Sequence, residues 1–198
     1  MAEYKMVWPV LIAFAISVIL GPFVIPYLRK LKMGQTERVD GVQSHLKKAG
    51  TPTMGGVIFL LSTVITSLFY IKDYPKIIPV LFLTLGFGII GFLDDYLIIK
   101  RHNNKGLTQL QKLFLQLVIA LIFFYIFINS GHEPVLLIYT LGIEIDMGWF
   151  YGLFILFVLL ASSNAVNLTD GLDGLAGGLS LIAFVTFGLI AWNSRGIY

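Results

Sequence analysis

The sequence contains no cysteine and few charged residues. None of its 198 residues is Cys, and only 13% are Asp, Glu, Lys or Arg, whereas soluble domains carry about 25% charged residues. Disulfides therefore cannot hold the fold. Hydrophobic residues make up 57% of the chain, above the roughly 45–50% of soluble domains. The composition excludes a soluble class and predicts an integral membrane protein. The small net charge of +3 gives no reason to expect a nucleic-acid partner.

Six uncharged stretches are about as long as a membrane helix requires. A helix needs about 20 apolar residues to cross the hydrocarbon core. The stretches are Met6–Leu28, Met54–Ile71, Ile77–Leu93, Leu113–Ser130, Met147–Leu168 and Leu175–Ser194. We therefore predict an all-α, polytopic helical bundle of about six transmembrane helices, forming a single membrane domain over residues 1–198. Pro22 and Pro26 lie in the first stretch, so a kink or an early end is expected there.

Lys and Arg concentrate in two connecting segments. Six lie in Arg29–Lys48, and four lie in Lys100–Lys112 without any acid. Gly131–Asp146 instead carries three acids and no Lys or Arg. Because basic residues mark the cytoplasmic side, the N-terminus is predicted to be extracytoplasmic and the Leu168–Gly174 turn cytoplasmic. The three polar, motif-rich segments then share the cytoplasmic face. Residues Leu141–Trp149 could form a small extracytoplasmic strand or turn.

Two adjacent acids, Asp94 and Asp95, follow an apolar run that begins at Ile77. An Asp at a helix centre costs about 2.5–3.5 kcal/mol on the insertion scale, so the pair is expected near the cytoplasmic interface. Adjacent carboxylates repel unless a cation, a basic partner or a proton relieves them, and Mg²⁺ prefers carboxylate and phosphate oxygens. The pair fits either a functional site or an interfacial pair that merely ends a helix.

A second polar group follows at three-residue steps: Asn164, Asn167, Asp170 and Asp173. Each step falls about 60° short of a full helical turn, so one regular helix would not hold all four on one face. A helix that breaks near Thr169–Gly174 could gather them, and glycines there favour a break. Asn amides suit a base or a sugar, and the next helix's N-terminus suits phosphate. A polar turn with Asp caps would explain the acids but not the two Asn.

A third polar segment, SHLKKAGTPTMGG, places Lys47 and Lys48 before a turn that includes Thr53. Lys is a point-charge partner for phosphate, although the positive-inside rule alone accounts for both lysines. Together the three segments predict a site at the cytoplasmic membrane surface. Such a site suits a phosphate-bearing soluble substrate and a lipid-bearing partner, bridged by a divalent cation.

Four motifs occur in order along the chain: SHLKKAGTPTMGG, GFLDDY, NKGLTQLQK and SNAVNLTDGLDGLAGG. Together they resemble the phospho-N-acetylmuramoyl-pentapeptide-transferase family. The resemblance implies transfer of phospho-MurNAc-pentapeptide from UDP-MurNAc-pentapeptide to undecaprenyl phosphate, which yields lipid I and UMP with Mg²⁺. It also implies peptidoglycan synthesis at the bacterial cytoplasmic membrane and a homodimer.

The resemblance carries residue roles onto the matching motif positions. Asp94 and Asp95 would lie at the catalytic centre, where one takes or positions the proton of the lipid phosphate. Lys48 and Thr53 would reach the nucleotide-sugar side, and Lys112 the phosphates. The nucleotide and metal region would be lined by Asn164, Asn167, Asp170 and Asp173. The metal ligands implied are Asp94, Asp95 and Asp170.

The chain also departs from the family pattern. Members are expected to have about ten transmembrane helices, with a further aspartate and a His-rich loop that this sequence lacks. We therefore expect an N-terminal portion of a longer enzyme. Three alternatives stay open: a polyprenyl-phosphate N-acetylglucosamine-1-phosphate transferase, half of a transporter for an anionic sugar-phosphate, or a non-catalytic remnant. Transporter sites usually lie at a repeat interface near the membrane midplane, and no second inverted copy is visible in the sequence.

Overall fold

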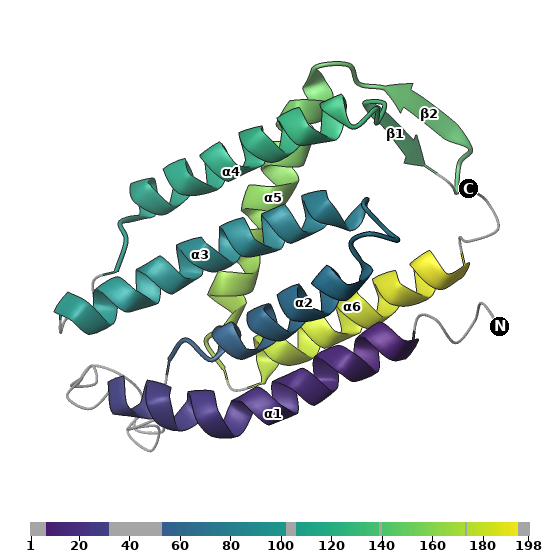
Figure 1. Cartoon of the computed structure of the whole chain (residues 1–198). Coiled ribbons are helices and arrows are strands. Elements are labelled where there is room, and N and C mark those ends of the chain that lie inside the picture. Colours follow the sequence, from purple (N-terminus) through teal and green to yellow (C-terminus); the bar gives the residue numbers. More distant parts are fainter. Residues whose placement is uncertain (1–6, 32–52, 102–105, 139, 173, 194–198) are drawn as a thin grey trace. The chain divides into compact units, whose positions relative to one another are not determined.

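The structure, a computed structural model, describes residues 7–31, 53–101, 106–138, 140–172 and 174–193. Within these ranges the chain forms six helices and one pair of strands (Figure 1). The elements are α1 (Val7–Leu31), α2 (Gly56–Tyr70), α3 (Ile77–Arg101), α4 (Gln109–Asn129), β1 (Val135–Ile138), β2 (Ile143–Asp146), α5 (Phe150–Thr169) and α6 (Leu175–Asn193). The chain divides after Pro134 into two compact units, the first holding α1–α4 and the second holding the strands, α5 and α6.

The helices have the length and surface of membrane-spanning segments. Within the described ranges, five are long and apolar enough to cross a membrane, and α2 is a shorter apolar helix of 15 residues. Large apolar side chains face outward, such as Phe14, Phe114 and Phe184, which are 68%, 64% and 75% exposed. An apolar exterior of this kind is expected where lipid replaces water as the solvent. The prediction of an all-α, multi-pass membrane protein is therefore confirmed.

Two helices run past their predicted ends. α1 continues through Pro22 and Pro26 and ends at Leu31, so the expectation of an early end is wrong. Neighbouring helices can satisfy backbone groups that a proline frees within a membrane helix. α3 continues to Arg101 rather than ending near Leu93. Both helices have basic residues in their last turn. These positive charges interact favourably with the negative C-terminal end of the helix dipole.

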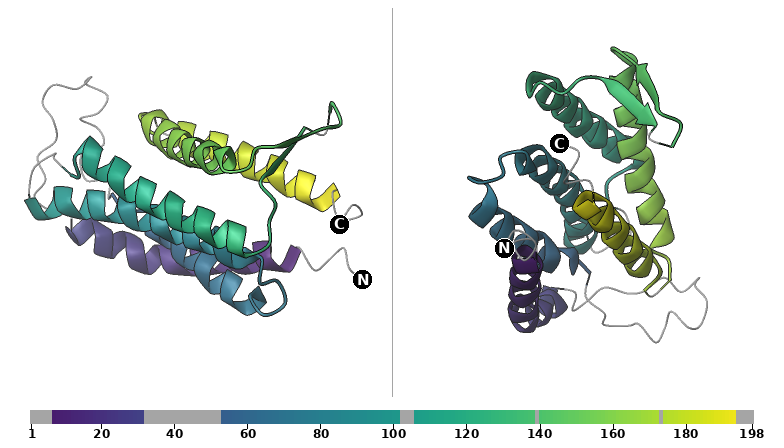
Figure 2. Two further views of the ribbon diagram at one scale, coloured as in Figure 1. Left: turned by 90° about the horizontal axis from the view of Figure 1, so that it is seen from above. Right: turned by 90° about the vertical axis from the view of Figure 1, so that its right-hand side faces the viewer.

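The four helices of the first unit pack in chain order, each against the next (Figures 1 and 2). The α1–α2 contact is polar: the Ser17 hydroxyl donates to Ser62 Oγ at 2.7 Å, and Ser62 donates to the Phe59 carbonyl at 3.0 Å. Ser62, Thr66 and Ser67 of α2 are all buried. Small and polar side chains are the usual means by which membrane helices associate.

The α2–α3 contact depends on a glycine. A Cβ placed on Gly88 of α3 would come within 2.7 Å of Leu60 Cδ1 on α2. The two helices can approach this closely because position 88 has no side chain. Close approach at small residues is a recurring feature of helix packing in membranes, and here it brings α3 to the middle of the first unit.

The second unit contains an antiparallel hairpin and a pair of helices. β1 pairs with β2 in the register that places Val135 opposite Asp146 and Ile138 opposite Ile143. Of the strand or turn expected within Leu141–Trp149, the structure shows a strand, β2, whereas β1 was not predicted. Helices α5 and α6 meet at the connection between them and diverge from it (Figure 1).

Candidate functional site

The two adjacent acids lie within a helix. α3 passes through Asp94 and Asp95 and continues to Arg101, so the pair does not end a helix. Both residues are half-buried, and the Asp94 side chain is only 16% exposed. Helix α3 therefore holds both backbones rigidly, close to its C-terminal end.

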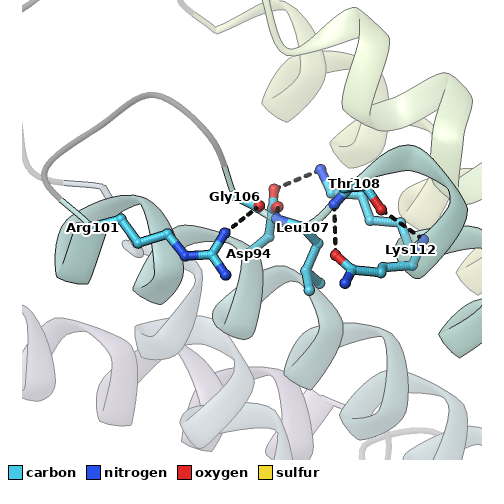
Figure 3. Close-up of polar contacts among 7 residues, drawn as sticks. Asp94, Arg101, Gly106, Leu107, Thr108 and Lys112 are labelled. Atoms are coloured by element: carbon cyan, nitrogen blue, oxygen red, sulfur yellow. Dashed lines mark hydrogen bonds and ion pairs between the residues drawn. The ribbon is translucent and has the colours of Figure 1, made fainter.

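The Asp94 carboxylate is held from two sides (Figure 3). Lys112 Nζ of α4 lies 2.6 Å from Oδ2, and the Leu107 backbone N–H donates to Oδ1 at 2.7 Å. Charge-assisted contacts of this length are among the stronger hydrogen bonds in proteins. Of the cation, basic partner or proton that could relieve the repulsion between the adjacent acids, a basic partner is present. The contacts tie α3 to α4 and to the segment between them.

Gly106 makes this contact possible. A Cβ at position 106 would overlap Asp94 Oδ1 and would lie 2.9 Å from both the Asp94 carboxyl carbon and its backbone oxygen. Any side chain there would have to push the segment away from Asp94. The guanidinium of Arg101 also donates to the Gly106 carbonyl at 3.3 Å. Neither Gly106 nor Leu107 was predicted as a site residue, although both lie inside the motif NKGLTQLQK.

The start of α4 fixes the position of Lys112. Thr108 caps the helix: its hydroxyl accepts the Gln111 N–H at 3.2 Å, while the Gln111 side chain accepts the Thr108 N–H at 2.9 Å. This reciprocal pair is a capping box. The Lys112 N–H then donates to the Thr108 carbonyl at 3.0 Å. The TxxQ pattern was a signal in the sequence that could have located this helix start.

The predicted break in the second polar group is confirmed. α5 ends at Thr169, Asp170 forms its C-terminal cap, Gly174 has a φ of +79° and α6 begins at Leu175. Asp170 therefore does not cap a helix start. Asn167 and Asp170 are exposed.

The two Asn of this group lie on α5. The amide of Asn164 donates to the Leu160 carbonyl at 2.8 Å, a bond along its own helix. Asp173 lies outside the described residues, as does Lys48 of the third segment. Asp94, Asp95 and Lys112 belong to the first compact unit, and Asn164, Asn167 and Asp170 to the second.

Thr53 precedes an unusual backbone position. Thr53 is exposed, and the next residue, Met54, is buried with a φ of +67°. Few residues other than glycine adopt a positive φ, and such positions cluster at functional sites. Gly55 and Gly56 then open α2. No pattern in the sequence indicates the Met54 conformation.

The donor set suits a magnesium ion that is bound together with a substrate. Within the described ranges, no group of three or more Asp, Glu, His or Cys side chains comes together. Mg²⁺ is usually held by one or two carboxylates plus substrate phosphates rather than by a cage of protein ligands. Asp94 and Asp95 supply two carboxylates, and a carboxylate has about four lone-pair sites. Lys112 and the Leu107 N–H occupy one site on each oxygen of Asp94.

Comparison with known proteins identifies the family. Glycosyl transferase family 4 matches residues 77–198, which include both aspartates, Lys112 and the second polar group. The chain belongs to this family. Within the same chain, phospho-N-acetylmuramoyl-pentapeptide-transferase signature 1 matches residues 48–60. The matched residues include Lys48 and Thr53, which were predicted to bind the nucleotide-sugar.

Three curated proteins that are similar to this chain share the same name. Proteins called phospho-N-acetylmuramoyl-pentapeptide-transferase from Bacillus pumilus (strain SAFR-032) and Bacillus subtilis (strain 168) are 46% and 45% identical to it over 197 residues. The protein of that name from Shouchella clausii (strain KSM-K16) is 46% identical over 197 residues. Each match covers 98% of this chain and 61% of the relative. The chain thus spans about three fifths of the length of these relatives.

Proposed function

We propose that this family 4 chain carries the catalytic carboxylates of a phospho-sugar transferase. The reaction moves phospho-MurNAc-pentapeptide from UDP-MurNAc-pentapeptide to undecaprenyl phosphate, forming lipid I and UMP for peptidoglycan synthesis. The name of the relatives supports this reaction. The observation that carries the proposal is Asp94, held by Lys112 and by a backbone N–H near the end of a membrane helix.

The net reaction exchanges one P–O bond for another. An oxygen of the lipid phosphate bonds to the phosphorus that bears the sugar, and the bond from that phosphorus to the UMP oxygen breaks, with the electron pair leaving on UMP. Catalysis of phosphoryl transfer is mostly positioning and charge stabilisation. In the proposal, one of Asp94 and Asp95 takes or positions the lipid phosphate proton. The ammonium of Lys112 attracts the phosphate oxygens.

Polar residues outside the aspartate pair would bind the nucleotide-sugar. Lys48 and Thr53 are proposed to contact the nucleotide-sugar side, and signature 1 spans both positions. The second polar group is proposed to line the nucleotide site: Asn164, Asn167, Asp170 and Asp173. The helix break supports this role, because exposed amide and carboxylate groups lie next to the start of α6, and an amide both donates to and accepts from a base.

Mg²⁺ is the proposed cofactor, with Asp94, Asp95 and Asp170 as its ligands. A bound Mg²⁺ would neutralise charge on the phosphate oxygens. The proposed location is the bacterial cytoplasmic membrane, with the site on the cytoplasmic face because the basic segments Arg29–Lys48 and Lys100–Lys112 flank it in sequence. We also propose that the chain forms a single membrane domain. This domain would be part of a subunit with ten helices, and two such subunits would form a homodimer.

The test measures UMP release from UDP-MurNAc-pentapeptide in detergent with undecaprenyl phosphate and Mg²⁺. The assay uses the 198-residue chain, and also a chimera in which the chain replaces the matching part of the Bacillus subtilis relative. Asp94→Asn in the chimera should lower kcat by roughly 10²–10⁴-fold, the usual contribution of a positioned acid or base. Asp73→Asn is the matched control, because Asp73 is an exposed carboxylate in the α2–α3 connection.

Each outcome bears on the proposal. The proposal is supported if UMP release by the chimera requires both the lipid and Mg²⁺. Asp94→Asn must also lower this release by the expected factor, whereas Asp73→Asn must not. Turnover of UDP-N-acetylglucosamine in place of the muramoyl substrate would favour the related hexosamine transferase. Substrate flux across vesicles without a covalent product would favour transport. Full turnover by the Asp94→Asn chimera would refute the role of Asp94.

A further inference from the structure

The β1–β2 hairpin has one wholly apolar face. Opposite residues of paired strands point to the same side, and alternate residues along a strand share a side. The observed register therefore puts four apolar side chains on one face: Leu136, Ile138, Ile143 and Ile145. The other face carries two acids beside two apolar residues: Glu144, Asp146, Val135 and Leu137. The two faces of the hairpin thus differ in polarity: one is apolar and the other carries both acids.

The apolar face needs a cover. Ile143 and Ile145 are 45% and 43% exposed, whereas Leu136 and Ile138 are half-buried. Neither strand has a residue that the described part of the chain buries fully. An isolated two-stranded hairpin is marginally stable in water. Its apolar face is therefore expected to contact another apolar surface, either protein or lipid.

The position of the hairpin in the chain indicates that this surface is the lipid of the membrane. Only Met147–Trp149 separate β2 from α5, a helix long and apolar enough to cross a membrane. The step from Asp146 to Phe150 reaches at most about 14 Å in extended chain. The hairpin must therefore lie within that reach of the start of α5, and Figure 1 shows the short link between the two. If α5 starts at the bilayer boundary, the hairpin lies at that boundary too.

The residues at this junction have the chemistry of a membrane interface. Trp149 and Phe150 stack with their ring centroids 3.9 Å apart and are 70% and 54% exposed. Tryptophan is enriched at the membrane–water boundary. Residues 131–150 include no Lys or Arg, so attraction to anionic headgroups cannot hold the hairpin there. Apolar contact with lipid is the remaining source of affinity.

We propose that the β1–β2 hairpin lies in the membrane–water interface, with its apolar face on the lipid and Glu144 and Asp146 toward water. In this position the hairpin fixes the depth at which α5 enters the bilayer. The partner is a neutral lipid surface, and the proposal is independent of the transferase reaction.

The absence of cysteine makes a direct test straightforward. Ile143→Cys, Glu144→Cys and Ile145→Cys are each labelled with a nitroxide in the full chain, reconstituted into phosphatidylcholine vesicles. Power saturation then compares accessibility to oxygen, which partitions into lipid, with accessibility to a water-soluble nickel chelate. Labels at 143 and 145 should favour oxygen severalfold over the label at 144, so that the pattern alternates with period two. Position 144 serves as the matched control for its two neighbours.

Two results would overturn the proposal. Equal nickel accessibility at all three positions would mean that the hairpin stands in water. Labels at 143 and 145 that are shielded from both reagents would mean that protein covers the face. A second measurement leaves the hairpin sequence unchanged. Trp8 and Trp192 are replaced by Phe so that Trp149 is the only tryptophan. Brominated phosphatidylcholine should then quench the Trp149 fluorescence. A lack of quenching would also contradict the interfacial position.

Discussion

At the scale of single residues, the contact between Gly106 and Asp94 is open to a sharp test. In the transferase chimera, Gly106→Ala should lower kcat at least tenfold with little change in KM, because the added Cβ displaces the Leu107 N–H from the Asp94 carboxylate. Gly91→Ala is the control, since a Cβ at that α3 position meets nothing within 4 Å. Equal kcat values for the two variants would show that the Gly106 contact does not position Asp94.

The ion pair itself can be tested by a double-mutant cycle. Lys112→Met and Asp94→Asn each remove one partner of a contact that is mostly shielded from water. Coupled groups typically show interaction energies of roughly 0.5–3 kcal/mol, so the losses in kcat/KM should be clearly non-additive. Steady-state kinetics of the two single variants and the double variant measure this coupling. Strictly additive losses would mean that the two side chains act separately.

The sequence predicted part of this residue-scale arrangement. Repulsion between Asp94 and Asp95 called for a cation, a basic partner or a proton, and a basic partner is present. Sequence alone did not identify that partner as Lys112, because the contact depends on how α4 returns beside α3. It also could not reveal the Leu107 N–H, since backbone donors leave no mark in residue type. The proposed roles of both aspartates remain predictions, because a role depends on where the substrate binds.

At the scale of elements, two buried hydroxyls of α2 should behave differently. Ser62 bonds to Ser17 of α1, whereas Thr66 Oγ1 has no hydrogen-bond partner among the described residues. Ser62→Ala should lower the free energy of unfolding by about 0.6 kcal/mol, the average for a hydrogen bond between membrane helices. Thr66→Val keeps the shape and removes an unpaired group, so it should be neutral or stabilising. Unfolding by SDS titration in mixed micelles gives both values, and a larger loss for Thr66→Val would contradict the interpretation.

Helix starts and ends were predicted with unequal success. The starts at Ile77 and Leu175 match the structure because a turn immediately precedes each apolar run. α3 was predicted to end near Leu93, but it continues because Asp94 finds its partners without leaving the helix. α4 begins at Gln109 rather than near Leu113, since its first turn is polar and is held by a capping box. Uncharged stretches thus locate the apolar body of a helix better than its polar ends.

At the scale of the whole molecule, the distribution of basic residues predicts an orientation that thiol labelling can test. Lys100 lies at the end of α3 and Glu133 follows α4, and both are exposed. In spheroplasts, a membrane-impermeant maleimide should label Glu133→Cys from outside, and should label Lys100→Cys only after permeabilisation. The reverse pattern would overturn the proposed orientation. The background is clean because the chain contains no native cysteine.

Family membership was predicted from four motifs spread along the chain, and the match to glycosyl transferase family 4 confirms it. The match to signature 1 supports the choice of branch within that family. Motifs carry this information because long, specific patterns rarely recur by chance. They do not specify how the groups around Asp94 and Asp170 meet a substrate, since these residues belong to different compact units. Composition was sufficient for the fold class, because lipid requires an apolar exterior.

The Asp94–Lys112 pair also sets an order of events during synthesis. Lys112 follows Asp94 by 18 residues, so a ribosome working at roughly 5–20 residues per second needs about one to four seconds to supply it. For that interval the Asp94 carboxylate leaves the ribosome without its cation. α3 should therefore stay close to the insertion machinery until Lys112 of α4 reaches the same interface, where its ammonium pairs with the Asp94 carboxylate.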